Sequence, residues 1–71
     1  MKSVTLVIVP GTGAKSIQVE DTMTVSELVT RENLFGRDII INGSGVQASQ
    51  FNTQTLAGAV EVFATGSVKG N

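Results

Sequence analysis

A single segment with helical spacing decides what this chain can fold into. Residues 24–27, Thr-Val-Ser-Glu, match a capping box, in which the threonine oxygen and the glutamate carboxylate satisfy amide donors at a helix start. Val25, Leu28 and Val29 follow at positions i, i+3 and i+4, which predicts a short helix that ends near Asn33. A helix of roughly ten residues is too short to be stable alone, so it must pack on a sheet.

The other apolar segments have the alternation of strands. Residues 3–9 are rich in β-branched side chains, and Pro-Gly-Thr-Gly after them supplies turn chemistry. Residues 16–20 alternate polar and apolar side chains, so the two segments form a β-hairpin. Two more strands are predicted over residues 38–42 and 59–65, and an Asn-Gly-Ser-Gly turn at 42–45 precedes a short extended stretch at Val46. Residues 47–54 are expected to form a loop with one short strand or helical turn.

The order β, β, α, β, irregular segment, β predicts an α+β domain in two layers. A mixed sheet of four to five strands would carry the helix on one face, which is the β-grasp, or ubiquitin-like, arrangement. With 71 residues the chain is long enough for one such domain, residues 1–71, of which 66–71 form a short C-terminal tail.

The composition excludes most kinds of chemistry. The chain has no cysteine and no histidine, which removes disulfides, Cys/His metal sites and the usual general base. Its net charge of −1 provides no attraction for nucleic acid or an anionic membrane. The carboxylates lack metal-ligand spacing, and the Gly-rich loop before Lys15 lacks the glycine and the following helix of a phosphate loop. We therefore expect no catalytic residues, no metal and no cofactor.

Three short motifs carry a family resemblance. Residues 24–29, Thr-Val-Ser-Glu-Leu-Val, are similar to a helix opening of a threonine, an apolar residue and Glu-Leu-Leu. Residues 40–43, Ile-Ile-Asn-Gly, are similar to a Val-Asn-Gly turn, and residues 56–62 to Leu-x-x-Gly-Asp-x-Val, with Ala59 in place of the aspartate. Together they resemble the sulfur carriers of the β-grasp fold, the small subunit of molybdopterin synthase and the thiamine-biosynthesis sulfur carrier.

The C-terminus departs from that family. The resemblance implies a chain that ends in Gly-Gly, whose terminal carboxylate a partner enzyme adenylates and converts to a thiocarboxylate. Here Gly70 matches the penultimate glycine, and Asn71 stands at the reacting position. Asparagine adds a Cβ and an amide where glycine lets the backbone approach an active site closely. This departure favours a β-grasp scaffold used for protein contact.

Strand parity predicts where that contact lies. One set of alternating side chains is expected to face the helix: Val4, Leu6, Ile8, Ile17, Val19, Ile39, Ile41, Val60 and Val62. The opposite set then lies on a sheet face that one helix leaves uncovered: Thr5, Val7, Val9, Ile40 and Phe63. Uncovered apolar side chains often mark contact surfaces, although outward valines are also common on sheets. The candidate protein-binding residues are Val7, Ile40, Phe63, Val68, Gly70 and Asn71.

The function predicted is a non-enzymatic protein-contact module that binds a protein partner or self-assembles. A surface with fourteen serines and threonines suits a structural or decorating subunit of a larger assembly, such as a phage particle. The alternatives are a divergent sulfur carrier or ubiquitin-like modifier that works through its C-terminus with an activating enzyme, and an unreactive inhibitor of such an enzyme. No apolar run approaches the ~20 residues of a membrane helix, and no leader pattern is present. We expect a cytoplasmic protein, or one assembled into a virion made there.

Overall fold

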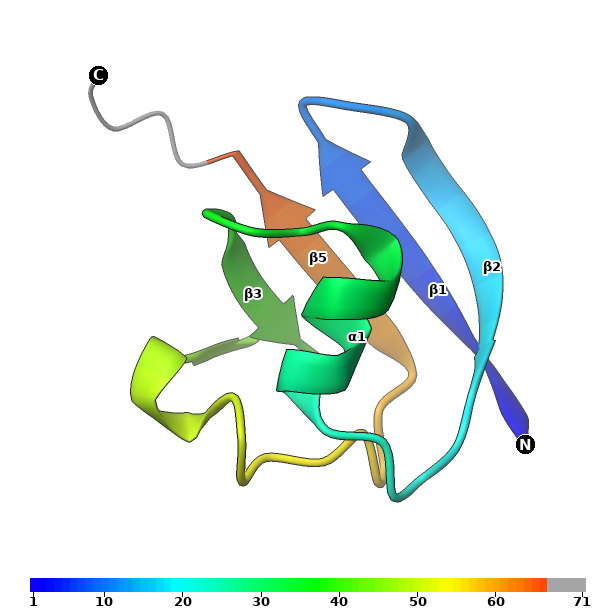
Figure 1. Ribbon diagram of the computed structural model, residues 1–71. Coiled ribbons are helices and arrows are strands. Elements are labelled where there is room, and N and C mark those ends of the chain that lie inside the picture. The colour runs from blue at the N-terminus through cyan, green and yellow to red at the C-terminus, as the bar shows by residue number, and fades with distance from the viewer. Residues whose placement is uncertain (67–71) are drawn as a thin grey trace.

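Five strands and one α-helix make up the fold of the computed structural model, which describes residues 1–66 (Figure 1). The elements in chain order are β1 (Lys2–Val9), β2 (Gly13–Val19), α1 (Val25–Glu32), β3 (Asp38–Ile41), β4 (Ser44–Val46), a 3-10 turn (Ala48–Gln50) and β5 (Glu61–Thr65).

The strands form one mixed sheet in the order β2-β1-β5-β3-β4. β1 and β5 run parallel at the centre, and every other neighbouring pair is antiparallel. α1 crosses one face of the sheet, as Figure 1 shows. This α+β architecture is consistent with a β-grasp-like fold, as the order of the elements in the sequence predicted.

The helix begins and ends as its sequence predicts. Thr24 Oγ1 accepts from the N–H of Glu27 at 3.1 Å, and Glu27 Oε1 accepts from the N–H of Thr24 at 2.9 Å, so the capping box is complete. Asn33 ends the helix in the left-handed conformation, with a φ of 59°. The predicted stripe of Val25, Leu28 and Val29 is buried.

The core lies between α1 and the sheet. The alternating residues of β1, β2 and β3 that were predicted to face the helix are all buried. Leu34, Leu56 and Ala59, which lie outside the helix and strands, complete the core at 4% exposure or less. The full set of buried apolar residues is Val4, Leu6, Ile8, Ile17, Val19, Val25, Leu28, Val29, Leu34, Ile39, Ile41, Leu56, Ala59, Val62 and Ala64.

One inward prediction is wrong. Val60 is 69% exposed, and Ala59 occupies the core in its place. The physical reason is that β5 begins only at Glu61, so the strand alternation that places Val62 inside does not extend back to Val60. In this region the side chain of Asn42 binds the backbone N–H groups of Val60 and Glu61.

Smaller differences concern where the elements begin and end. β2 starts at Gly13 instead of Ser16, because the ladder with β1 extends to the pair Ile8 and Gly13. The polar segment 47–54 contains a 3-10 turn and no strand. Within residues 1–66, no helix is both long and apolar enough to cross a membrane.

Candidate protein-contact face

The sheet face opposite α1, here called the open face, carries a row of apolar side chains. In the register of the central strands, Val7 of β1 lies beside Phe63 of β5, and Phe63 lies beside Ile40 of β3. Ala14 of β2 and Gly45 of β4 continue the same row to the two edges. This apolar row therefore contains three large side chains that lie side by side on adjacent strands: Val7, Phe63 and Ile40.

Neighbouring rows on the open face are polar at their centre. Thr5 lies between Ser16 and Glu61 on one side of the apolar row. On the other side Thr65 lies between Val9 and Asp38. Thr5 and Val9 are exposed, as parity predicts, and Val7, Ile40 and Phe63 are partly exposed. The open face is thus an apolar stripe with hydroxyl groups and two carboxylates at its margins.

The edges of the sheet are protected against pairing with another strand. At the β2 edge, the Arg31 guanidinium donates to the backbone oxygen of Gln18 at 2.9 Å, which removes one free acceptor. Lys15, on the inward side of β2, reaches Glu32 of α1 at 3.1 Å. β4, at the other edge, is three residues long. Inward charges and short edge strands both disfavour edge-to-edge association, so the open face is the more suitable contact surface.

The ion pairs also account for two lowered carboxyl pKa values. The hydrogen bond and the charge of Lys2, 2.8 Å away, hold the pKa of Asp21 below its ordinary value of 3.8. Burial acts to raise the pKa of Glu32, but Lys15 and then Arg31 outweigh it, so this pKa lies below 4.5. Both carboxylates are bound to basic side chains and are structural.

A hollow beside the N-terminal end of β1 is lined by charged groups that already bind one another or the backbone. It is lined by Met1, Lys2, Glu20, Asp21 and Thr22. The Lys2 ammonium in it donates to the backbone oxygen of Leu56 at 2.7 Å and binds Asp21. Residues 1–66 contain no group of three side chains able to hold a metal ion.

The predicted contact residues divide into two groups. Val7, Ile40 and Phe63 are brought together on the open face, whereas Val68, Gly70 and Asn71 lie outside the described residues. The two carboxylates that flank the apolar row, Asp38 and Glu61, were missed. Their parity with Ile40 and Phe63, two residues away on the same strands, is the signal that identifies them.

The sequence matches no protein-family model and no curated protein.

Proposed function

We propose that this chain is a non-enzymatic protein-contact module that binds through the open face of its sheet. The observation that carries the proposal is the alignment of Val7, Phe63 and Ile40 in one row across three neighbouring strands. Contiguous apolar side chains on the surface of a small domain mark contact sites more often than scattered ones do. Because the edges of the sheet are protected, a partner is more suitably bound on the open face than by adding a strand to an edge.

A structural or decorating role in a larger assembly is the form of this function that we favour. The surface is polar largely through serine and threonine, and hydroxyl groups are buried at interfaces at lower cost than charges. A virion assembled in the cytoplasm is one assembly of this kind.

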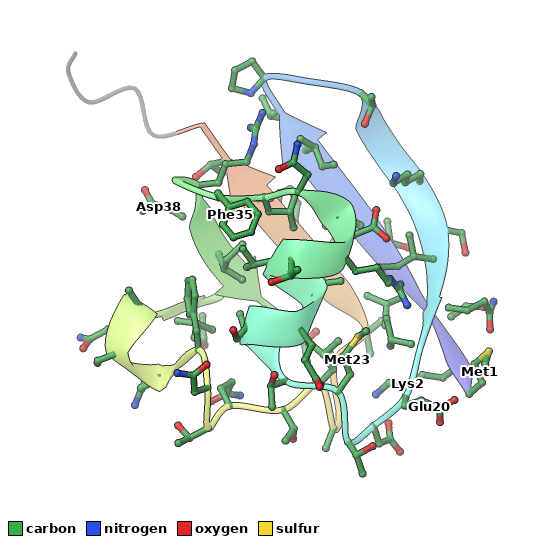
Figure 2. The ribbon with its side chains drawn as sticks, in the orientation of Figure 1. Met1, Lys2, Glu20, Met23, Phe35 and Asp38 are labelled. Atoms are coloured by element: carbon green, nitrogen blue, oxygen red, sulfur yellow. The ribbon has the colours of Figure 1, made fainter. Side chains whose placement is uncertain are left out.

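A pair of matched substitutions tests the open face. Phe63→Glu places a charge at the centre of the proposed contact, where an unpaired charge costs on the order of 2 to 5 kcal/mol of association. Phe35→Glu is the control, because Phe35 is 64% exposed in the loop between α1 and β3, away from the open face (Figure 2). The measurement is the native mass of the complexes that the tagged full chain forms in its own source.

Phe63→Glu and Ile40→Glu should abolish these complexes, and Phe35→Glu should leave them intact. Circular dichroism should show that all three variants are folded, since Phe63 and Ile40 lie outside the core. Complexes that persist unchanged in both open-face variants would exclude this surface as the binding site.

A divergent sulfur carrier or ubiquitin-like modifier is the second candidate function. It is favoured by the β-grasp-like architecture together with the helix-opening motif at residues 24–29. In this alternative an activating enzyme would act on the C-terminal carboxylate of Asn71. Fold alone is a poor guide to activity, and the replaced glycine makes this candidate the weaker one.

A further inference from the structure

The two carboxylates at the margins of the open face differ from the other acidic groups of the domain. Glu20, Asp21 and Glu32 each lie within ion-pair distance of a basic group, and Glu27 accepts a hydrogen bond in the helix cap. Asp38 and Glu61 are exposed, and within residues 1–66 their side chains have neither an ion pair nor a hydrogen bond. Among residues 1–66, the two carboxylates without a partner therefore both lie on the open face.

No basic side chain of the described strands accompanies them on that face. Lys2 and Lys15 have the inward parity of their strands and bind Asp21 and Glu32. Arg31 belongs to α1 on the opposite side of the sheet and binds Glu32. Arg37 precedes β3 and makes no ion pair with Asp38, and its Nη1 atom is buried. As far as residues 1–66 are concerned, the open face is thus acidic, although the whole chain is almost neutral, with a net charge of −1.

The two carboxylates lie on opposite sides of the apolar row. Glu61 precedes Phe63 by two residues on β5, and Asp38 pairs with Thr65, which follows Phe63 by two residues. From the rise per residue and the spacing between strands, the Asp38 and Glu61 backbones are roughly 14 Å apart. A contact centred on Phe63 therefore covers the apolar row and reaches both charges.

We propose that the open face binds a protein surface that presents apolar side chains between two lysine or arginine residues. This inference rests on the proposed function and adds the chemistry of the partner to it. Charge complementarity carries the argument, because basic side chains would meet Asp38 and Glu61 while apolar ones cover Phe63. A second copy of the open face fits less well, since it would bring the same two carboxylates and no basic residue from its strands.

Selection of peptides on the face tests this chemistry directly. A random-peptide display library is selected on the full chain and counter-selected on its Phe63→Glu variant. Synthetic forms of the enriched peptides are then titrated against the wild type, Asp38→Asn, Glu61→Gln and Glu20→Gln. Glu20→Gln removes the same charge at the side of the molecule away from Asp38 (Figure 2), so it is the control for a general effect of net charge.

The expected peptides carry lysine or arginine on both sides of an apolar centre. Loss of either carboxylate should weaken their binding about two- to fivefold, which is the range of a single exposed ion pair, and high salt should remove the difference. Glu20→Gln should leave the affinity unchanged.

Each other outcome overturns a distinct part of the inference. Peptides that need Phe63 but carry no preference for lysine or arginine would refute the proposed chemistry of the partner. The same holds for peptides whose affinity is unchanged in both Asp38→Asn and Glu61→Gln. Either result would still agree with the open face as the contact surface. Failure to obtain any peptide that depends on Phe63 would count against the contact face itself. Self-association of the full chain that Phe63→Glu abolishes would show that a second copy is the occupant.

Discussion

Asn42 and Glu61 bind each other through two hydrogen bonds at the junction of β3 and β5. The N–H of Asn42 donates to the Glu61 backbone oxygen at 2.9 Å, and the N–H of Glu61 donates to Asn42 Oδ1 at 3.1 Å. Asn42 Oδ1 also accepts from the N–H of Val60 at 2.9 Å, and Asn42 Nδ2 donates to the Gly58 oxygen at 2.9 Å. One side chain thus fixes the end of β3, the loop before β5 and the start of the strand that carries Phe63.

Replacement of this asparagine should destabilise the domain. Asn42→Ala removes three side-chain hydrogen bonds. It also places alanine at a φ of 50°, in the left-handed region that alanine adopts less readily than asparagine does. Because these bonds are at the surface, we expect a loss of about 1 to 3 kcal/mol in the free energy of unfolding, measured by urea denaturation. Asn52→Ala is the control, since the exposed Asn52 side chain has no hydrogen bond within residues 1–66, and it should change stability by less than about 0.5 kcal/mol. Equal stability of the two variants would refute the role given to Asn42.

The helix cap provides a second stability prediction. Thr24→Ala removes the hydroxyl that accepts from the N–H of Glu27, and loss of such a cap costs typically about 1 kcal/mol. Thr24→Ser keeps the acceptor and should restore most of the loss. Thr22→Ala is the matched control in the same loop, because Thr22 is exposed and has no part in the cap. A serine variant as unstable as the alanine variant would mean that the methyl group, not the cap, is responsible.

The lowered pKa of Glu32 predicts how the free energy of unfolding depends on pH. Burial raises its pKa, but Lys15 and Arg31 lower it by more, so the folded-state pKa lies below the ordinary value of 4.5. The stability that Glu32 contributes is therefore fully present above pH 4.5 and is lost as the pH falls through the folded-state pKa. Glu32→Gln should reduce the dependence of the unfolding free energy on pH in this acid range.

The size of this effect is limited, since Lys15 is about half exposed at its side chain. An ion pair of this kind contributes about 0.2 to 1 kcal/mol at neutral pH. Asp21→Asn should have an effect of the same sign, because its pKa is also lowered, by Lys2. A Glu32→Gln variant that loses stability in acid as the wild type does would show that other carboxyl groups account for this loss.

The fold could be predicted to a large extent because its local signals agree with each other. The capping box and the apolar stripe of Val25, Leu28 and Val29 place the helix, and alternation in residues 3–9 places β1. The error at Val60 arose because parity assumes an uninterrupted strand, and no local pattern shows that the side chain of Asn42 binds the backbone there. Long-range contacts of this kind are not encoded in sequence periodicity.

The open face could be predicted as a set of residues, but not as a surface. Parity separates Phe63 and Ile40 from the core, whereas their side-by-side position depends on β5 lying between β1 and β3. The two strands nearest to β5 in space are distant from it in the sequence, so this order could not be read from neighbouring segments. The flanking charges of Asp38 and Glu61 follow from the same parity once the row has been recognised.

A reaction at the C-terminus distinguishes the two proposed functions, a contact module and a sulfur carrier. A carrier's terminal carboxylate attacks the α-phosphate of ATP in its activating enzyme and releases pyrophosphate to form an acyl-adenylate. The full chain is incubated with ATP, an adenylating enzyme of a sulfur-carrier pathway and a sulfide source, which displaces AMP from an acyl-adenylate to give a thiocarboxylate, and its intact mass is measured. We expect no acyl-adenylate and no thiocarboxylate, because the sequence has asparagine, with its Cβ and amide, at position 71, where sulfur carriers have glycine. A mass shift on the native chain would refute the contact-module proposal in favour of a carrier. A shift that appears only after Asn71→Gly would show that the rest of the chain still fits the activating enzyme, and that the terminal side chain alone prevents the reaction.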